Sequence, residues 1–166
     1  MRALPLALLM LALAAAPVRA VLPEDRVEGD TATAAQWEAA VEAWGAMDWP
    51  AMTERLEAIL RVRPFHADAL TLMGYGARRM DDPARALAYY ARALAVEPAH
   101  RGALAYQGVA WLRTGDRASA EANLARLRDA CPEGCAALDA LAEALDHHAM
   151  TGETLERCPE DAPPFD

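Results

Sequence analysis

Two cysteines that lie close together in the sequence are the residues best placed for covalent chemistry. They stand in the stretch Cys131-Pro-Glu-Gly-Cys135. In an oxidising compartment this spacing can close a small disulfide ring, because a loop before a helix can bring the two sulfur atoms together. We expect such a ring to fasten a C-terminal capping helix onto the helices before it. Cys158 is then left over, and it could be free, pair between two chains or compete for Cys135.

Thiol or metal chemistry is the alternative use of these cysteines. The Cys131–Cys135 pair, with Cys158 and with His147 and His148 nearby, could bind a soft metal such as copper. The spacing of the pair matches neither a thioredoxin-type C-x-x-C nor a haem-attachment motif. The sequence also lacks a Gly-rich phosphate loop, a G-x-S-x-G and an H-E-x-x-H. We therefore expect no enzyme activity, no cofactor and no metal, and we keep a thiol- or copper-handling accessory role as the second hypothesis.

The chain must position any site with helices, because apolar residues recur at helical spacing and alanine is abundant. Between these helices, Asp82-Pro83 combines an N-cap residue with a proline at the first helical position, which is a strong signal for a new helix. Two other aspartates, Asp48 and Asp116, stand 34 residues before and after Asp82. The periodicity predicts helices over about 33–46, 50–63, 67–79, 83–96, 101–113, 117–129 and from 137 onward.

A 34-residue period runs through four series of residues. The closing proline recurs as Pro64, Pro98 and Pro132, and the other three series keep the same register. The small residue at the helix crossing recurs as Ala40, Gly74, Gly108 and Ala142, and the buried position of the second helix as Leu56, Tyr90 and Leu124. A period of 34 residues with these residue types is typical of paired antiparallel helices.

The stretch 67–100 resembles a tetratricopeptide repeat (TPR) over its whole length. Its signature positions are filled by Leu70, Gly74, Ala86, Tyr90, Ala93 and Pro98. The resemblance implies an all-α TPR solenoid of three helix-turn-helix repeats, at about 33–66, 67–100 and 101–134, followed by a capping helix at 135–148. It also places His66 and His100 at one position of successive repeats, on the order of 10 Å apart, which is too far for one metal. We interpret both histidines as loop residues.

The two ends of the chain differ from this repeat region. Residues 1–20, MRALPLALLMLALAAAPVRA, read as a cleaved secretory signal peptide, with an uncleaved anchor as the alternative. Residues 21–32 are polar without an apolar period, and we expect a flexible lead-in there. Residues 149–166 are acidic and rich in proline, which predicts a disordered tail. The signal peptide predicts export to a bacterial periplasm, with no membrane insertion once the signal is cleaved.

The net charge of −9 argues against nucleic acid and anionic lipid as partners. In TPR proteins the first helix of each repeat lines the concave face, and the resemblance therefore implies a groove for a protein or peptide partner. The residues that it places there are Trp37, Val41, Trp44, Thr71, Tyr75, Arg78, Arg79, Val109, Leu112 and Arg113. Aromatic and arginine side chains are enriched at interface hot spots, so we predict a non-catalytic adaptor or assembly factor. Alternatively, the tryptophans pack against the lead-in and the arginines are solvated.

The oligomeric state is left open by the sequence, and association of two chains through the first helix is a further possibility. The identity of the partner, the pathway served and the role of Cys158 are not encoded in any motif.

Overall fold

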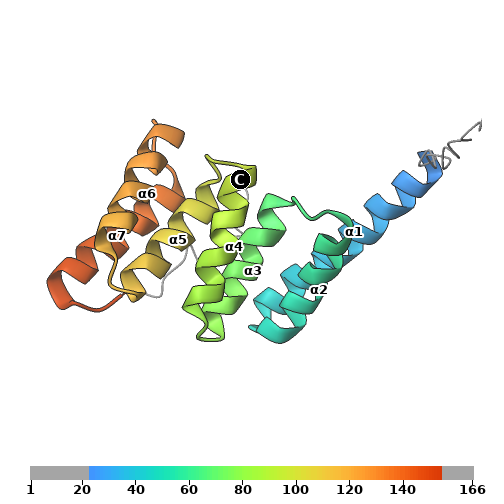
Figure 1. Ribbon diagram of the computed structural model, residues 1–166, viewed down its shortest axis with the longest axis horizontal. Helices are drawn as coiled ribbons and strands as arrows, with labels where there is room; N and C mark the ends of the chain where they lie inside the picture. Colours follow the sequence, from blue (N-terminus) through green and yellow to red (C-terminus); the bar gives the residue numbers. More distant parts are fainter. Residues whose placement is uncertain (1–22, 155–166) are drawn as a thin grey trace, which may run out of the picture.

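The computed structural model describes residues 23–154 of the chain, with side chains from residue 31 onward. This part consists of seven α-helices without a strand, arranged as antiparallel pairs along one axis (Figure 1). The helices are α1 (Pro23–Gly45), α2 (Trp49–Val62), α3 (Ala67–Arg79), α4 (Pro83–Val96), α5 (Arg101–Arg113), α6 (Arg117–Ala130) and α7 (Ala136–Thr151). None of these helices is long and apolar enough to cross a membrane.

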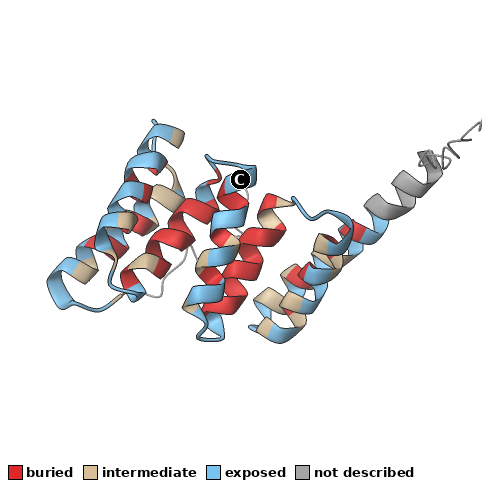
Figure 2. Cartoon of the chain, in the orientation of Figure 1, coloured by how far each residue is buried: buried red, intermediate tan, exposed pale blue. Residues whose placement is uncertain are grey.

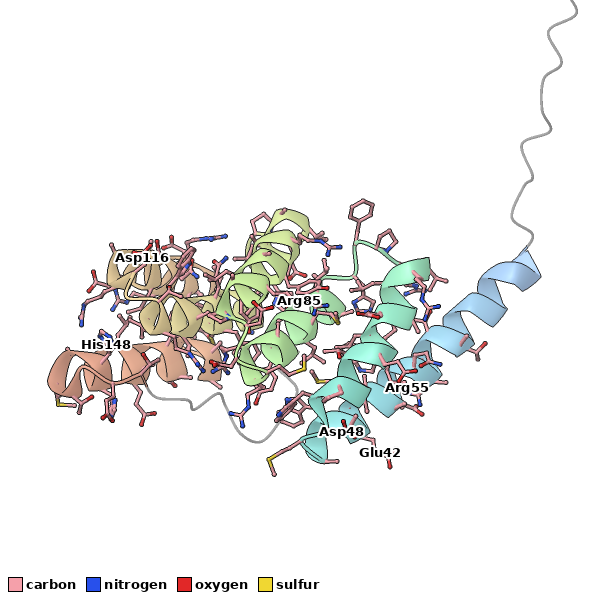
Figure 3. The ribbon with its side chains drawn as sticks, turned by 60° about the horizontal axis from the view of Figure 1, so that its bottom comes forward. Glu42, Asp48, Arg55, Arg85, Asp116 and His148 are labelled. Atoms are coloured by element: carbon pink, nitrogen blue, oxygen red, sulfur yellow. A yellow bond between two sulfur atoms is a disulfide. The ribbon has the colours of Figure 1, made fainter. Side chains whose placement is uncertain are left out.

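The second helix of each pair begins at the aspartate that the 34-residue period predicts. Asp48 accepts a hydrogen bond of 3.0 Å from the amide of Ala51, and Asp116 accepts one of 3.0 Å from the amide of Ser119. Asp82 caps α4 in the same way. Asp48 and Asp116 mark the starts of α2 and α6 in Figure 3. A side-chain oxygen at this position satisfies an amide that the helix itself leaves without a partner, which is why the helix starts there.

Successive helices pack as neighbours along the array. Each odd-numbered helix from α1 to α5 lies against the helix that follows it, α2 lies against α3, and α4 lies against α5. The last helix, α7, covers α5 and α6, as a capping helix should. Burial is concentrated in α3 and α5, at the centre of the array (Figure 2).

A glycine sets the close approach of α3 and α4. A Cβ atom added at Gly74 would lie 2.5 Å from a ring carbon of Tyr90, which is fully buried. The equivalent glycine of the next repeat, Gly108, faces Leu141 of α7 instead. The small residues of the period are therefore the points where a neighbouring helix presses its large side chain against the backbone.

The helix boundaries agree with the sequence prediction at the centre and differ at the ends. The predicted flexible lead-in at 21–32 is wrong for residues 23–32, because α1 extends back to Pro23. Proline is favoured in the first turn of a helix, and the acids Glu24 and Asp25 follow it there. At the other end, α7 continues to Thr151, past the predicted end of the cap at 148. The predicted signal peptide at 1–20 and residues 155–166 of the predicted tail lie outside the described residues.

Candidate functional site

The candidate site is the side of α3 and α5 that faces away from the second helices of the repeats. Gly74 of α3 lies against Tyr90 of α4, and Gly76 lies against Met52 and Thr53 of α2. Because residues 100° apart point in different directions on a helix, these two contacts leave a third side of α3 that carries Tyr75. The residues of this third side and their equivalents on α5 are called the inner face below: Thr71, Tyr75, Arg78, Arg79, Ala105, Val109, Leu112 and Arg113.

Tyr75 is the centre of an aromatic cluster that joins three successive repeats. Its ring centroid lies 6.3 Å from that of Trp44 on α1, 5.5 Å from that of Trp49 on α2 and 5.4 Å from that of Tyr106 on α5. Tyr106 in turn lies 6.3 Å from Tyr90. Offset and edge-on contacts at these distances contribute roughly 0.5–1.5 kcal/mol each beyond the area that they bury. The cluster holds the inner face rigid across the repeat boundaries.

Two members of this cluster were missed by the sequence analysis. Trp49 is the first residue of α2, a position that has no place in the repeat template. Tyr106 stands one residue beyond Ala105, a residue of the inner face on α5. Its nearness to Tyr75 follows from how α3 and α5 pack and has no signal in the sequence.

Guanidinium groups lie beside the aromatic cluster. Arg78 places its guanidinium carbon 5.2 Å from the Tyr75 ring centroid, and Arg79 places its own 5.1 Å from that of Trp49. Arg113 forms an ion pair of 2.9 Å with Asp81, in the turn between α3 and α4, and so links the end of α5 to that turn. Aromatic faces attract cations, and desolvation strengthens that attraction. The site therefore combines apolar rings with positive charge.

The exposure of the predicted groove residues needs a correction. Thr71 is fully buried, Arg78 is 1% exposed, and Tyr75, Val109 and Leu112 are also buried. The prediction that these five side chains line an open surface is therefore wrong with respect to their exposure. The Thr71 hydroxyl donates to the carbonyl of Ala67 at 2.9 Å, so its polar group is satisfied inside its own helix. The remaining predicted residues, Trp37, Val41, Trp44, Arg79 and Arg113, are exposed or half-buried.

The structure assigns the two periodic histidines a role that the sequence analysis did not predict. His66 and His100 are the N-cap residues of α3 and α5, and each accepts the amide of the third residue after it through Nδ1. His100 also reaches back to Asp68 in the first turn of α3, with Nε2 and Oδ1 2.9 Å apart. His66 stacks on Trp37, with ring centroids 5.6 Å apart. His66 thus joins the start of α3 to α1, and His100 joins the start of α5 to α3.

Burial disfavours the protonated form of His66. Removal of the imidazole from water lowers the pKa of His66 below its ordinary value, and nearby Asp68 offsets this only in part. The neutral ring has a free lone pair on Nδ1, which the N-cap hydrogen bond requires. The direction of the pKa shift and the capping role therefore agree.

The cysteine pair lies at the junction between α6 and α7. Cys131 is the C-cap residue of α6, Cys135 is the N-cap residue of α7, and the structure places the two at disulfide distance with their Cα atoms 5.9 Å apart. Cys158 lies outside the described residues. Within residues 31–154, no three His, Cys, Asp or Glu side chains are grouped so that they could hold a metal ion.

Comparison with known proteins identifies the fold. The TPR domain of Sgt2 from Aspergillus fumigatus resembles this structure with a TM-score of 0.60, at 15% sequence identity, over 81% of this chain and 90% of that chain. No family model matches the sequence, and no curated protein matches it. The chain is an all-α helical-repeat solenoid with the fold of a TPR domain, as its 34-residue period predicted.

Proposed function

We propose that this chain is a non-catalytic protein-interaction module that holds an extended segment of a partner protein along its inner face. The observation that supports this most directly is the aromatic cluster around Tyr75, which has arginines beside it and extends over three repeats. Rings and guanidinium groups in one place suit a segment that carries both apolar and acidic side chains.

The charge distribution of the chain favours an acidic partner segment. The protein as a whole has a formal charge of −9, whereas α3 ends with two arginines in succession, Arg78 and Arg79. An acidic segment is therefore repelled by most of the molecule and attracted at this end of the inner face. This contrast favours one binding position and one orientation of the partner.

We further propose that the protein works in the periplasm as an adaptor or assembly factor. Two observations support this: the N-terminal run MRALPLALLMLALAAAPVRA and the cysteine pair at disulfide distance. Disulfides persist in oxidising compartments and are rare in reducing ones. Mass spectrometry of the protein recovered from cell fractions tests this part, and a reduced, full-length chain in the cytoplasmic fraction would contradict it.

The binding experiment uses two arginines in matched surroundings. Arg79 on α3 and Arg92 on α4 are both exposed, and each lies over an aromatic ring, at 5.1 Å from Trp49 and 5.4 Å from Tyr89 respectively. Arg79→Glu changes the inner face, whereas Arg92→Glu makes the same charge change on a second helix of a repeat. Arg78 is unsuitable because it is 1% exposed, and a glutamate there would be a buried charge beside a tyrosine ring.

The partner is captured from periplasmic extract, identified and purified, and its affinity for each variant is measured by calorimetry. We expect Arg79→Glu to weaken binding at least tenfold and Arg92→Glu to leave the affinity within about twofold. Equal affinities for the two variants would show that the partner binds elsewhere.

A further inference from the structure

The centre of the inner face is deeply buried. Among the helices from α1 to α7, α3 packs against α2, α4 and α5, while α5 packs against α3, α4, α6 and α7. These contacts cover the sides of both helices and leave the inner side, where Thr71 and Val109 lie. Yet Thr71 is fully buried, and Ala105 and Val109 are each 2% exposed. No other described helix packs against α3 or α5.

The described chain ends at the edge where α3 and α5 end. Because neighbouring helices in the array are antiparallel, α7 runs in the same direction as α3 and α5, and all three end at the same edge (Figure 1). Gly152 has a φ of 73°, the left-handed conformation that stops a helix and turns the chain. The Glu153 amide donates to the Thr151 hydroxyl at 3.0 Å, and the Glu153 carbonyl lies 3.1 Å from His147 Nδ1. The chain therefore leaves α7 folded back on its own last turn.

The remaining residues, 155–166, have the composition that the inner face requires. They read LERCPEDAPPFD, with four acidic side chains and a single arginine. Their acids complement Arg79 and Arg113 at the edge where α7 ends, and Leu155 and Phe165 can contact the apolar strip of α5. Three prolines favour an extended chain, which loses less conformational entropy when it docks.

The segment is also long enough to extend along the inner face from α7 to α3. Twelve extended residues reach roughly 40 Å. The inner face from α7 to α3 spans two helix spacings, roughly 20 Å, and a helix of 13 residues such as α5 is about 20 Å long.

We propose that residues 155–166 of this chain bind its own inner face as an internal ligand. The proposal uses the face named under the proposed function and assigns its resting occupant. A partner must displace this segment before it can bind, so the chain binds its partner more weakly and more selectively than an uncovered inner face would. A tethered segment at an effective concentration of about 1 mM, with an intrinsic Kd of about 0.1 mM, weakens the partner about tenfold.

The experiment uses the mature full chain and its native Cys158. With Cys131 and Cys135 oxidised, Cys158 is the remaining thiol of the three cysteines, and it takes a nitroxide spin label without any substitution. We expect paramagnetic broadening of amides of α3 and α5 in the ¹⁵N spectrum, with α4 and α6 less affected. In the variant Glu160→Lys with Asp161→Lys, whose changes lie outside every described helix, this broadening should be lost. Broadening confined to the end of α7, or equal in both proteins, would overturn the proposal.

Two controls separate the remaining outcomes. In the first control, spin-labelled chain at natural isotope abundance is mixed with ¹⁵N-labelled chain that carries no spin label. Broadening of α3 and α5 amides in this mixture would show that the segment binds a second copy of the chain, and it would overturn the proposal of an internal ligand. A synthetic peptide of residues 155–166 is then titrated onto both full-length proteins. We expect it to bind the Glu160→Lys, Asp161→Lys variant about tenfold more tightly than the unaltered chain, and a charge-reversed peptide to bind neither. If the peptide binds both proteins equally, the internal ligand fails, while partner binding to the Arg79→Glu variant still tests the proposed function.

Discussion

Replacement of Gly74 by alanine tests the contact that sets the spacing of α3 and α4. The new Cβ atom would lie 2.5, 2.7 and 2.9 Å from three atoms of the Tyr90 ring. That ring is fully buried and touches Tyr106 at 6.3 Å between centroids, so it cannot swing away without disturbing the cluster. Overpacking of this kind costs about 1–3 kcal/mol, whereas the higher helix propensity of alanine returns about 1 kcal/mol. We expect a net loss of up to about 2 kcal/mol in the free energy of unfolding.

Gly45 provides the matched control for this substitution. It is the last residue of α1, its exposed backbone has nothing within 4 Å of an added Cβ, and its φ is not positive. Gly45→Ala should therefore be neutral or should stabilise the chain by up to about 1 kcal/mol. Urea titration followed by circular dichroism at 222 nm measures both variants.

The Gly74 result is checked a second time in a Tyr90→Leu background. Without the ring, Gly74→Ala should cost less than about 0.5 kcal/mol, because the clash that it creates depends on Tyr90. The same destabilisation in both backgrounds would refute the reasoning, as would a Gly74→Ala variant as stable as Gly45→Ala.

Three further predictions follow from the structure. Replacement of Cys131 and Cys135 together by serine should lower the free energy of unfolding by about 2 kcal/mol; dithiothreitol should destabilise the unaltered chain equally and leave this variant unchanged. Because burial lowers the pKa of His66, the imidazole binds a proton less readily in the folded chain than in the unfolded chain, where its pKa is near 6.5. The contribution of His66 to stability is therefore complete above that pH and is lost as the pH falls below it. Urea midpoints measured between pH 7.5 and 5.5 should show this loss, and the dependence should be weaker in His66→Asn. Asn123, 4% exposed, donates to the Leu104 carbonyl at 3.1 Å and to Gln107 Oε1 at 3.0 Å, so Asn123→Ala should cost about 1–3 kcal/mol while exposed Arg128→Ala on the same helix should stay within about 0.5 kcal/mol.

The repeat architecture could be predicted from the sequence because its determinants are local. The aspartate before each second helix is a capping residue whatever surrounds it, and the helix boundaries of α3, α4 and α5 followed from it and from the periodic proline. Gly74 and Tyr90 were likewise identifiable, because a small residue facing a large one in a fixed register belongs to the 34-residue pattern.

The site could be predicted only in part because its properties depend on neighbouring repeats. The sequence indicates that Tyr75 and Arg78 share one side of a helix, but not how deeply that side is covered, which led to the error on their exposure. Trp49 joins the cluster through the angle between α2 and α3, and His100, the N-cap residue of α5, meets Asp68 of α3. The prediction for the lead-in was wrong for a different reason: a segment without an apolar period can still be helical, and Pro23 with the acids Glu24 and Asp25 favours the start of a helix there.

The hydrogen bond between His100 and Asp68 has a consequence for how such a chain can grow. Both residues belong to the same 34-residue unit, 67–100, as do Gly74 and Tyr90. A tandem duplication of this unit would therefore carry both of these contacts into the new copy. An array lengthened by whole copies would keep both contacts in every copy.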